Sequence, residues 1–195
     1  MTTQILSIKK LIQGKWLSLK EINYIDYFGK HRKWESVERV ASNGAVVILA
    51  TLMHSKELIL IRQYRPPVNN NIIEFPAGLI DDGETPEETA TRELQEETGY
   101  TGKIISSSIN SYSSPGLTSE KITFVKMLID ETLPENIHPQ TKFDEGEFIE
   151  LIKIPIQNLE EFIKISAKNG NSIDAKVLAF SEALSLSNNP IFQMN

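Results

Sequence analysis

Residues 78–100 read GLIDDGETPEETATRELQEETGY, and this stretch decides how the surrounding chain folds. Thr85 can cap the N-terminus of a helix, with Pro86 at the first helical position and Glu88 three residues after the cap. Gly99 is a typical stop at the C-terminus of a helix. The pattern therefore predicts a helix over residues 86–98.

Three glutamates of this helix, Glu93, Glu96 and Glu97, are spaced three and four residues apart, so their side chains share one face. They repel one another, and they lie near the helix C-terminus, where the helix dipole disfavours each carboxylate by roughly 0.3–1 kcal/mol. A solvated charged face is the usual explanation of such a run. A divalent cation would relieve both penalties, and Mg²⁺ in proteins is typically held by one or two carboxylates and substrate phosphates. The pattern favours a Mg²⁺ site, which Mn²⁺ could also fill.

Two neighbours of these glutamates are further candidates. Arg92 can reach Glu96 or fold back toward Glu84, which would orient the carboxylates, with an ordinary helix salt bridge as the alternative. The glycine-containing loop before the helix would bring backbone carbonyls, such as that of Ala77, beside the carboxylates.

Composition narrows the class of protein. The 195 residues contain 40 % apolar and 24 % charged side chains, which is typical of a globular protein. A net charge of −6 argues against wide contact with nucleic acid. The absence of cysteine excludes disulfides and thiolate chemistry. No apolar run is long enough to span a membrane and the start lacks the pattern of a signal peptide, so we expect a cytoplasmic protein, with the nucleus as the alternative.

The hydrophobic pattern divides the chain into two parts. Residues 1–40 show short apolar alternations that predict about three strands in an antiparallel arm, which needs to pack on the main body or on a second copy. Residues 41–195 contain denser strands interleaved with helices over residues 86–98 and about 174–186, and a shorter helix after Ile156. This order predicts an α/β fold, an α/β/α sandwich around a mixed sheet.

The central stretch resembles the motif of a known family. The pattern Gly-x5-Glu-x7-Arg-Glu-x-x-Glu-Glu-x-Gly is met at every fixed position, which are Gly78, Glu84, Arg92, Glu93, Glu96, Glu97 and Gly99. It looks like the Nudix box. The resemblance implies a loop–helix–loop that binds Mg²⁺ and hydrolyses a nucleoside diphosphate linked to another moiety. The metal ligands that it implies are Glu93, Glu96, Glu97 and Ala77.

Segments outside the box indicate the branch of this family. Pro115 stands fifteen residues after Tyr100, within SSPGLTSE at 113–120, and resembles the downstream proline of ADP-ribose pyrophosphatases. The segments RQYRPP at 62–67, EFPAGLIDDGE at 74–84 and GEFIE at 146–150 also look like that branch, especially its eukaryotic ADP-sugar pyrophosphatases. The resemblance implies that Leu79 and Pro115 contact the substrate.

The resemblance also implies a binding site for the nucleotide. Trp16 and Trp34 would stack on adenine, with core packing or a dimer contact as the alternative for each ring. Arg39 and Arg65 are candidates for the diphosphate or ribose, because a guanidinium binds phosphate oxygens in pairs. Glu35 could pair with Arg39 or reach the adenine of a partner chain.

The expected reaction is Mg²⁺-dependent hydrolysis of ADP-ribose to AMP and ribose 5-phosphate, with Glu93 and Glu97 at the metal and Arg92 orienting them. Glu147 resembles a glutamate near the attacking water and is the candidate general base. The similar enzymes are homodimers that build each site from both chains, so we expect a homodimer. Alternatives are another nucleoside diphosphate substrate, such as an oxidised guanine nucleotide, NADH or another nucleotide sugar, or a non-catalytic nucleotide-binding regulator.

Overall fold

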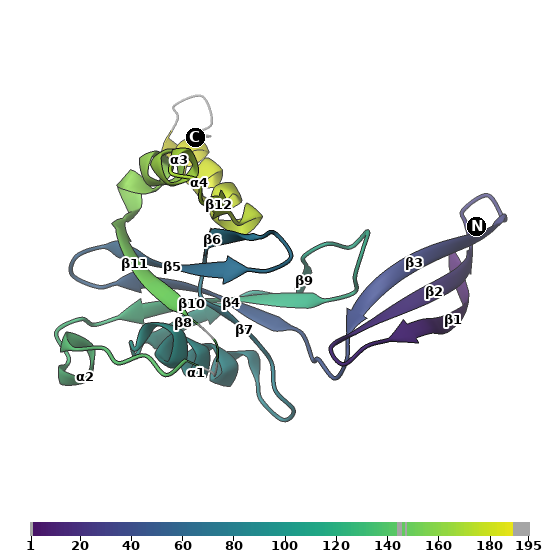
Figure 1. Cartoon of the computed structure of the whole chain (residues 1–195), viewed down its shortest axis with the longest axis horizontal. Helices are drawn as coiled ribbons and strands as arrows, with labels where there is room; N and C mark the ends of the chain where they lie inside the picture. Colours follow the sequence, from purple (N-terminus) through teal and green to yellow (C-terminus); the bar gives the residue numbers. More distant parts are fainter. Residues whose placement is uncertain (1, 144–145, 147, 189–195) are drawn as a thin grey trace.

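The computed structural model describes residues 2–143, 146 and 148–188, and it contains two separate sheets (Figure 1). The N-terminal sheet has three antiparallel strands, β1 (Gln4–Gln13), β2 (Leu17–Ile25) and β3 (His31–Arg39). It projects from the main body as an arm (Figure 1). The predicted antiparallel arm is confirmed.

The main sheet has nine strands within the described residues, and its principal order is β12-β6-β5-β4-β10-β8. Strand β11 pairs with β5, β7 with β4, and β9 with β10. The strands are β4 (Ala45–Leu52), β5 (Glu57–Arg65), β6 (Asn70–Glu74), β7 (Ala77–Leu79), β8 (Lys103–Ser107), β9 (Ser111–Tyr112), β10 (Lys121–Ile129), β11 (Ile149–Pro155) and β12 (Ser172–Ile173). The pairs β4–β10 and β6–β12 are parallel and the others antiparallel, so the sheet is mixed.

Helices cover both faces of this sheet (Figure 1). Helix α1 (Pro86–Thr98) lies on one face, while α3 (Leu159–Lys168), preceded by a 3₁₀ turn (Ile156–Asn158), and α4 (Ala175–Asn188) lie on the other. The short helix α2 (Pro134–Ile137) follows β10. The predicted α/β/α sandwich with a mixed sheet is therefore confirmed. None of the helices in the described ranges is long and apolar enough to cross a membrane.

Strand β4 shows why two hydrophobic cores form. It lies at the centre of the sheet, and its side chains alternate between the two faces. Val46, Ile48 and Ala50 are buried in the core that also holds Ala90 and Leu94 of α1. Val47 points the other way, into the core beneath α3 and α4, so the run is apolar on both faces, as expected for a strand covered by helices on both sides.

Two segments differ from a simple strand or loop. The apolar segment from Lys103 to Tyr112 forms two strands, because residues 108–110 interrupt the pairing with β10. The polar segment from Asp130 to Gly146 contains α2 near its start. Proline at the first helical position and the buried Asn136 fix that short helix, since the Asn136 amide donates to the Thr101 and Asp130 carbonyls at 3.0 and 2.9 Å.

Candidate active site

The helix of the central motif begins and ends where its sequence predicts. The Thr85 hydroxyl accepts a hydrogen bond from the Glu88 amide, and the Glu88 carboxylate accepts one from the Thr85 amide, so the capping box is complete. Gly99 closes the helix at φ 75°. The backbone of Gln140 crosses so near that a Cβ at Gly99 would lie 2.5 Å from its amide nitrogen. Gly99 therefore both ends α1 and lets the following loop pass over it.

A cavity of about 460 Å³ lies beside this helix. It is bounded by α1, β7, the end of β5, and residues of the loop after α2. Its lining residues are Arg39, Ala45, Gln63, Arg65, Ala77, Gly78, Leu79, Asp81, Arg92, Glu93, Glu96, Glu97, Glu120, Lys142 and Phe143. All three carboxylates of the glutamate face therefore line one cavity.

Gly78 makes room for one of these carboxylates. A Cβ placed on Gly78 would lie 1.9 Å from Glu93 Oε1 and 2.0 Å from its Cδ. The Glu93 side chain thus occupies the space that any other residue at position 78 would fill. The spacing of Gly78 and Glu93 in the motif has a steric cause, which is the close packing of β7 against α1.

Glu97 is the most buried carboxylate of the three, with 7 % of the residue exposed. One of its oxygens accepts a hydrogen bond from the Ala77 amide at 3.0 Å. A buried carboxylate is costly without such compensation. Ala77 makes this contact with its N–H group. The role of its carbonyl oxygen as a metal ligand stays a prediction.

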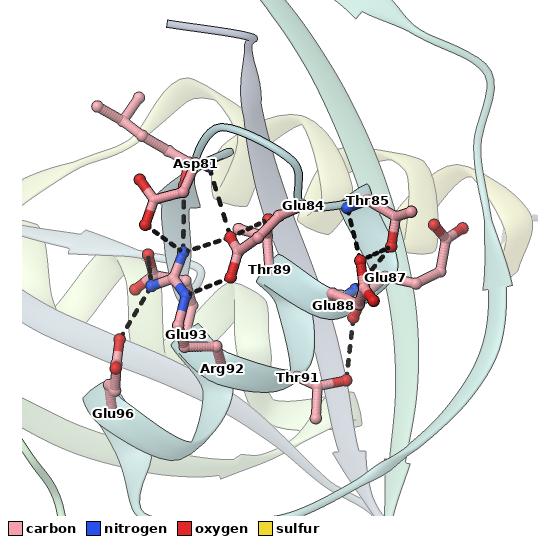
Figure 2. Close-up of polar contacts among 11 residues, drawn as sticks. Asp81, Glu84, Thr85, Glu87, Glu88, Thr89, Thr91, Arg92, Glu93 and Glu96 are labelled. Atoms are coloured by element: carbon pink, nitrogen blue, oxygen red, sulfur yellow. Dashed lines mark hydrogen bonds and ion pairs between the residues drawn. The ribbon is translucent and has the colours of Figure 1, made fainter.

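Arg92 sits between four carboxylates (Figure 2). Its guanidinium donates two hydrogen bonds of 2.9 Å to Glu84 and single bonds to Glu93 at 2.8 Å and Glu96 at 3.0 Å. Both predicted partners, Glu96 and Glu84, are therefore reached at once. The Arg92 bonds, with one from the Thr89 hydroxyl, lower the pKa of Glu84 to about 2. The bond to Glu84 is also the main reason that the pKa of Arg92 is raised.

The donor set of this cavity fits a hard divalent cation. Glu93, Glu96 and Glu97 offer only oxygen ligands, and Arg92 is the cation that contacts two of them. Arg92 already holds one oxygen of Glu93 and one oxygen of Glu96 by hydrogen bonds. A cation in the cavity would have to compete with Arg92 for these two oxygens.

Among the described residues, another group of possible metal ligands lies elsewhere, at His54, Asp130 and Glu131, within 4.8 Å of one another. The Glu131 carboxylate already accepts hydrogen bonds from the amides of His54 and Ser55, and Asp130 accepts two from Thr132. Although partial burial acts to raise it, the pKa of Glu131 falls to about 2 because of these amides. These hydrogen bonds tie the group to the turn between β4 and β5.

Two arginines also line the cavity, each paired with a carboxylate. Arg65 ends β5, as predicted, and its Nε donates to Glu74 at 2.7 Å. Arg39 ends β3 and its Nε donates to Glu120 at 2.7 Å. The alternative pairing of Arg39 with Glu35 is wrong, because four residues along a strand span about 13 Å, whereas that spacing brings side chains together only on a helix.

A second cavity of about 230 Å³ lies between the arm and the loop at 113–120. Trp34, Ser36 and Glu38, which share one face of β3, line it together with Pro115 and Leu117. The Trp34 indole donates to the Gly116 carbonyl at 3.1 Å, and the Val37 amide to the Leu117 carbonyl at 2.9 Å. The arm is therefore attached to the main body at this loop.

The predicted site residues thus fall into three groups. Arg39, Arg65, Ala77, Leu79, Arg92, Glu93, Glu96 and Glu97 line the first cavity, and Trp34 and Pro115 line the second. Trp16 and Glu35 are exposed and line neither, and the Trp16 ring, on a residue that is 68 % exposed, forms a cation–π pair with Lys15 at 4.4 Å. Glu147 lies outside the described residues.

Sequence reasoning missed some residues of the first cavity. Lys142 and Phe143 reach it because the Lys142 amide donates to the Glu96 carbonyl at 2.8 Å, which ties the loop to the end of α1. Gln63 and Glu120 also line it. Only Gln63 carried a usable signal, since an amide interrupts the apolar alternation of β5.

Comparison with known proteins decides the family. A model of the NUDIX domain matches residues 42–179, which include α1 and most of the first cavity's lining. The chain belongs to the Nudix family. The segment at 78–99 is therefore its Nudix box, and the resemblance inferred from the motif is confirmed.

Several Nudix relatives cover most of the chain. The ADP-ribose pyrophosphatase of Saccharomyces cerevisiae is 40 % identical over 179 residues, which are 87 % of this chain and 77 % of the yeast protein. The ADP-sugar pyrophosphatase of Mus musculus is 34 % identical over 198 residues, 97 % of this chain and 91 % of the mouse protein. A crystal structure of an ADP compounds hydrolase has the same fold, with a TM-score of 0.70, 20 % identity, and coverage of 95 % of this chain and 93 % of that one.

Proposed function

We propose that this Nudix protein hydrolyses the diphosphate bond of ADP-ribose and related ADP-sugars. The observation that carries the proposal is one cavity lined both by a carboxylate face, Glu93, Glu96 and Glu97, and by two arginines, Arg39 and Arg65. The first set suits a divalent cation and the second suits phosphate oxygens. The names of the yeast and mouse relatives supply the nucleoside and the sugar.

The reaction adds one water across the bridge between the two phosphates. The water oxygen forms a bond to one phosphorus, the bond from that phosphorus to the bridging oxygen breaks, and the bridging oxygen leaves on the other phosphate. From ADP-ribose the products are AMP and ribose 5-phosphate. A general base takes the water proton, and Glu147 is our candidate for that base on sequence grounds alone.

Each described residue has a distinct task in this proposal. Glu93, Glu96 and Glu97 would hold Mg²⁺, or Mn²⁺, which when bound supplies positive charge to the diphosphate and orients the reacting groups. Arg92 fixes the direction of Glu93 and Glu96 through its two hydrogen bonds. Arg39 and Arg65 bind and orient the phosphates.

We further propose that adenine stacks on Trp34 in the second cavity, beside Pro115. The indole is 48 % exposed, so part of its surface is open to a ligand, and its N–H is held by Gly116. Leu79 on the rim of the first cavity would contact the part of the substrate between adenine and the phosphates.

A homodimer is the assembly that we propose, with Trp16 and Glu35 acting on the site of the partner copy. Both residues lie outside the two cavities of their own chain. All ten residues of β1 are exposed, including Ile5, Ile8 and Ile12, and three-stranded sheets without a covered face are marginal in water. Sedimentation that finds only monomers, fully active at low concentration, would refute this assembly.

A second candidate substrate is GDP-mannose. The GDP-mannose pyrophosphatase of Shigella flexneri is 32 % identical over 199 residues, 96 % of this chain and 98 % of that protein. Stacking on a tryptophan tolerates any purine, so the ring alone does not exclude guanine.

The deciding experiment is product analysis by chromatography after incubation of the purified protein with ADP-ribose, GDP-mannose, NADH and diadenosine compounds, with and without Mg²⁺. We expect AMP from ADP-ribose at the highest rate, and only with metal. A faster reaction of another panel member would keep the Nudix chemistry and overturn the choice of substrate. No product from any compound would favour a nucleotide-binding regulator without catalysis.

A further inference from the structure

A third cavity, of about 330 Å³, adjoins the proposed catalytic cavity. It is lined by Gln63, Tyr64, Arg65, Pro66, Asn71, Gly146 and Phe148. Gln63 and Arg65 line both cavities, so the two spaces share a wall at the end of β5. A substrate whose diphosphate lies against Arg65 therefore has a neighbouring space for one of its two ends.

Gln63 is the unusual residue of this shared wall. Only 8 % of it is exposed, and its side-chain oxygen has no hydrogen-bond partner in the described structure. Among the described residues only one other buried side-chain polar atom, Ser36 Oγ, is in that condition, and Ser36 lines the second cavity. A buried polar atom without a partner is unfavourable and is rare in folded proteins. Because Gln63 lines two cavities, its unpaired oxygen points to a ligand.

Gln63 stands at a position of β5 where the strand pattern would place an apolar residue. Leu58 and Leu60 of β5 lie in the core beneath α3 and α4, while Ile59 lies in the core against α1. By the alternation of a strand, Gln63 shares the face of Ile59 and is directed to the α1 side, where the catalytic cavity is. An isoleucine or leucine would pack there without leaving a polar atom unsatisfied.

The chemistry of the amide limits what it can bind. Its oxygen accepts hydrogen bonds, and an ionised phosphate offers no proton to it. Arg39, Arg65 and Lys142, which line the catalytic cavity, offer the phosphates cationic partners there. A sugar hydroxyl can donate to the amide oxygen. The terminal torsion of a glutamine rotates readily, so the oxygen can turn toward either cavity.

The third cavity itself has the features of a sugar site. Two exposed aromatic residues, Tyr64 and Phe148, are among its lining residues, and aromatic rings can give apolar contact area to the C–H faces of a sugar. Asn71, also on its wall, adds a second amide. The Tyr64 hydroxyl donates to the Asn69 side chain at 2.6 Å, which holds that ring in place.

We propose that the third cavity binds the sugar on the non-nucleotide side of the diphosphate, and that Gln63 recognises it by accepting a hydrogen bond from a sugar hydroxyl. Gln63 would then determine specificity for the second half of the substrate, as Trp34 does for the first. Because this cavity is assigned to the second half of a substrate cleaved in the neighbouring cavity, the proposal rests on the proposed function.

The test compares two substrates that share the ADP half. One is ADP-ribose, and the other is the β-propyl ester of ADP, which has the same diphosphate bridge without a sugar. In Gln63→Met, which keeps the length of the side chain and removes the amide, kcat/KM for ADP-ribose should fall about tenfold, the loss expected for one neutral hydrogen bond. For the propyl ester it should change less than twofold.

Arg62→Gln is the matched control. Arg62 is the neighbour of Gln63 on β5, lies on the opposite face, and pairs with Glu150. It should leave the ratio of kcat/KM for the two substrates unchanged. Thermal unfolding checks the fold, and Gln63→Met should be at least as stable as the wild type because it removes the unsatisfied amide.

The outcomes separate this proposal from the proposed function. An equal loss of kcat/KM on both substrates, or no loss on either, would overturn the role of Gln63 while the hydrolase assignment stands. If Gln63→Met unfolds, Gln63→Leu carries the same test, with the same expected change in the ratio. A wild-type protein that cleaves neither substrate would overturn the proposed function, and with it the sugar site.

Discussion

Gly78→Ala should inactivate the enzyme without unfolding it. The new methyl carbon would lie 1.9 Å from Glu93 Oε1, whereas ordinary contact begins at 3.4 Å, so the carboxylate has to shift by about 1.5 Å. The atoms nearest to the methyl group all belong to the flexible end of the Glu93 side chain, which can rotate away at small cost in stability. A misplacement of about 1 Å costs a catalytic site on the order of 100-fold in rate, and we expect kcat/KM for ADP-ribose to fall at least that far.

The assay measures AMP release by chromatography over a range of Mg²⁺ concentrations, together with the melting temperature of each protein. Gly14→Ala is the control, because its new Cβ would meet only the Leu17 carbonyl oxygen, at an ordinary 3.7 Å. It should match the wild type in both measurements. If Gly78→Ala kept kcat/KM within about threefold of the wild type, the position of the Glu93 carboxylate would not matter for the reaction.

Four further variants test other parts of the site. Glu97→Gln keeps the shape of the buried side chain and removes its charge, so turnover with Mg²⁺, measured as AMP release, should fall at least about 100-fold. If Glu147→Gln keeps full turnover in the same assay, Glu147 is not the general base. In Glu84→Gln the melting temperature should drop at pH 7. The pKa of Glu84 is lowered from 4.5 to about 2, so the difference in melting temperature between the two proteins should be complete above pH 4.5 and disappear as the pH falls through about 2. Thermal scans at pH 7, 4 and 2.5 that find a constant difference would contradict this. Trp34→Leu should raise KM for ADP-ribose about tenfold or more with little change in kcat, measured by steady-state kinetics, since base stacking is worth roughly 1–3 kcal/mol; an unchanged KM would place adenine elsewhere.

The fold could be predicted largely because its signals are local. The capping box at Thr85 and the stop at Gly99 depend on neighbouring residues, and both ends of α1 are where they were predicted. The break between β8 and β9 was not predictable, because it depends on which residues of β10 pair with each strand. The same holds for α2, which is stabilised by Asn136 through bonds to a distant carbonyl.

The candidate site was predictable where its residues lie on one helix. The contacts of Arg92 with Glu84 and Glu96 were predicted from the motif, whereas the close approach of Glu93 to Gly78 on β7 was not. Contacts between residues far apart in the sequence were not predictable. Arg39 pairs with Glu120, which lies 81 positions later. The sequence also placed Trp16 and Trp34 together, whereas the structure of one chain separates them. The homodimer and the cytoplasmic or nuclear location stay predictions.

The attachment of the arm to the loop at 113–120 makes the alignment of β3 critical. The two faces of this strand serve different cavities, since Trp34 lines the second cavity and Arg39, five positions later, lines the first. An insertion or deletion of one residue within β3 would exchange its two faces. It would turn Trp34 away from the loop and withdraw the guanidinium from the cavity beside α1. On the proposed roles of Arg39 and Trp34, a fragment that begins at residue 41 lacks both side chains and should not carry out the reaction.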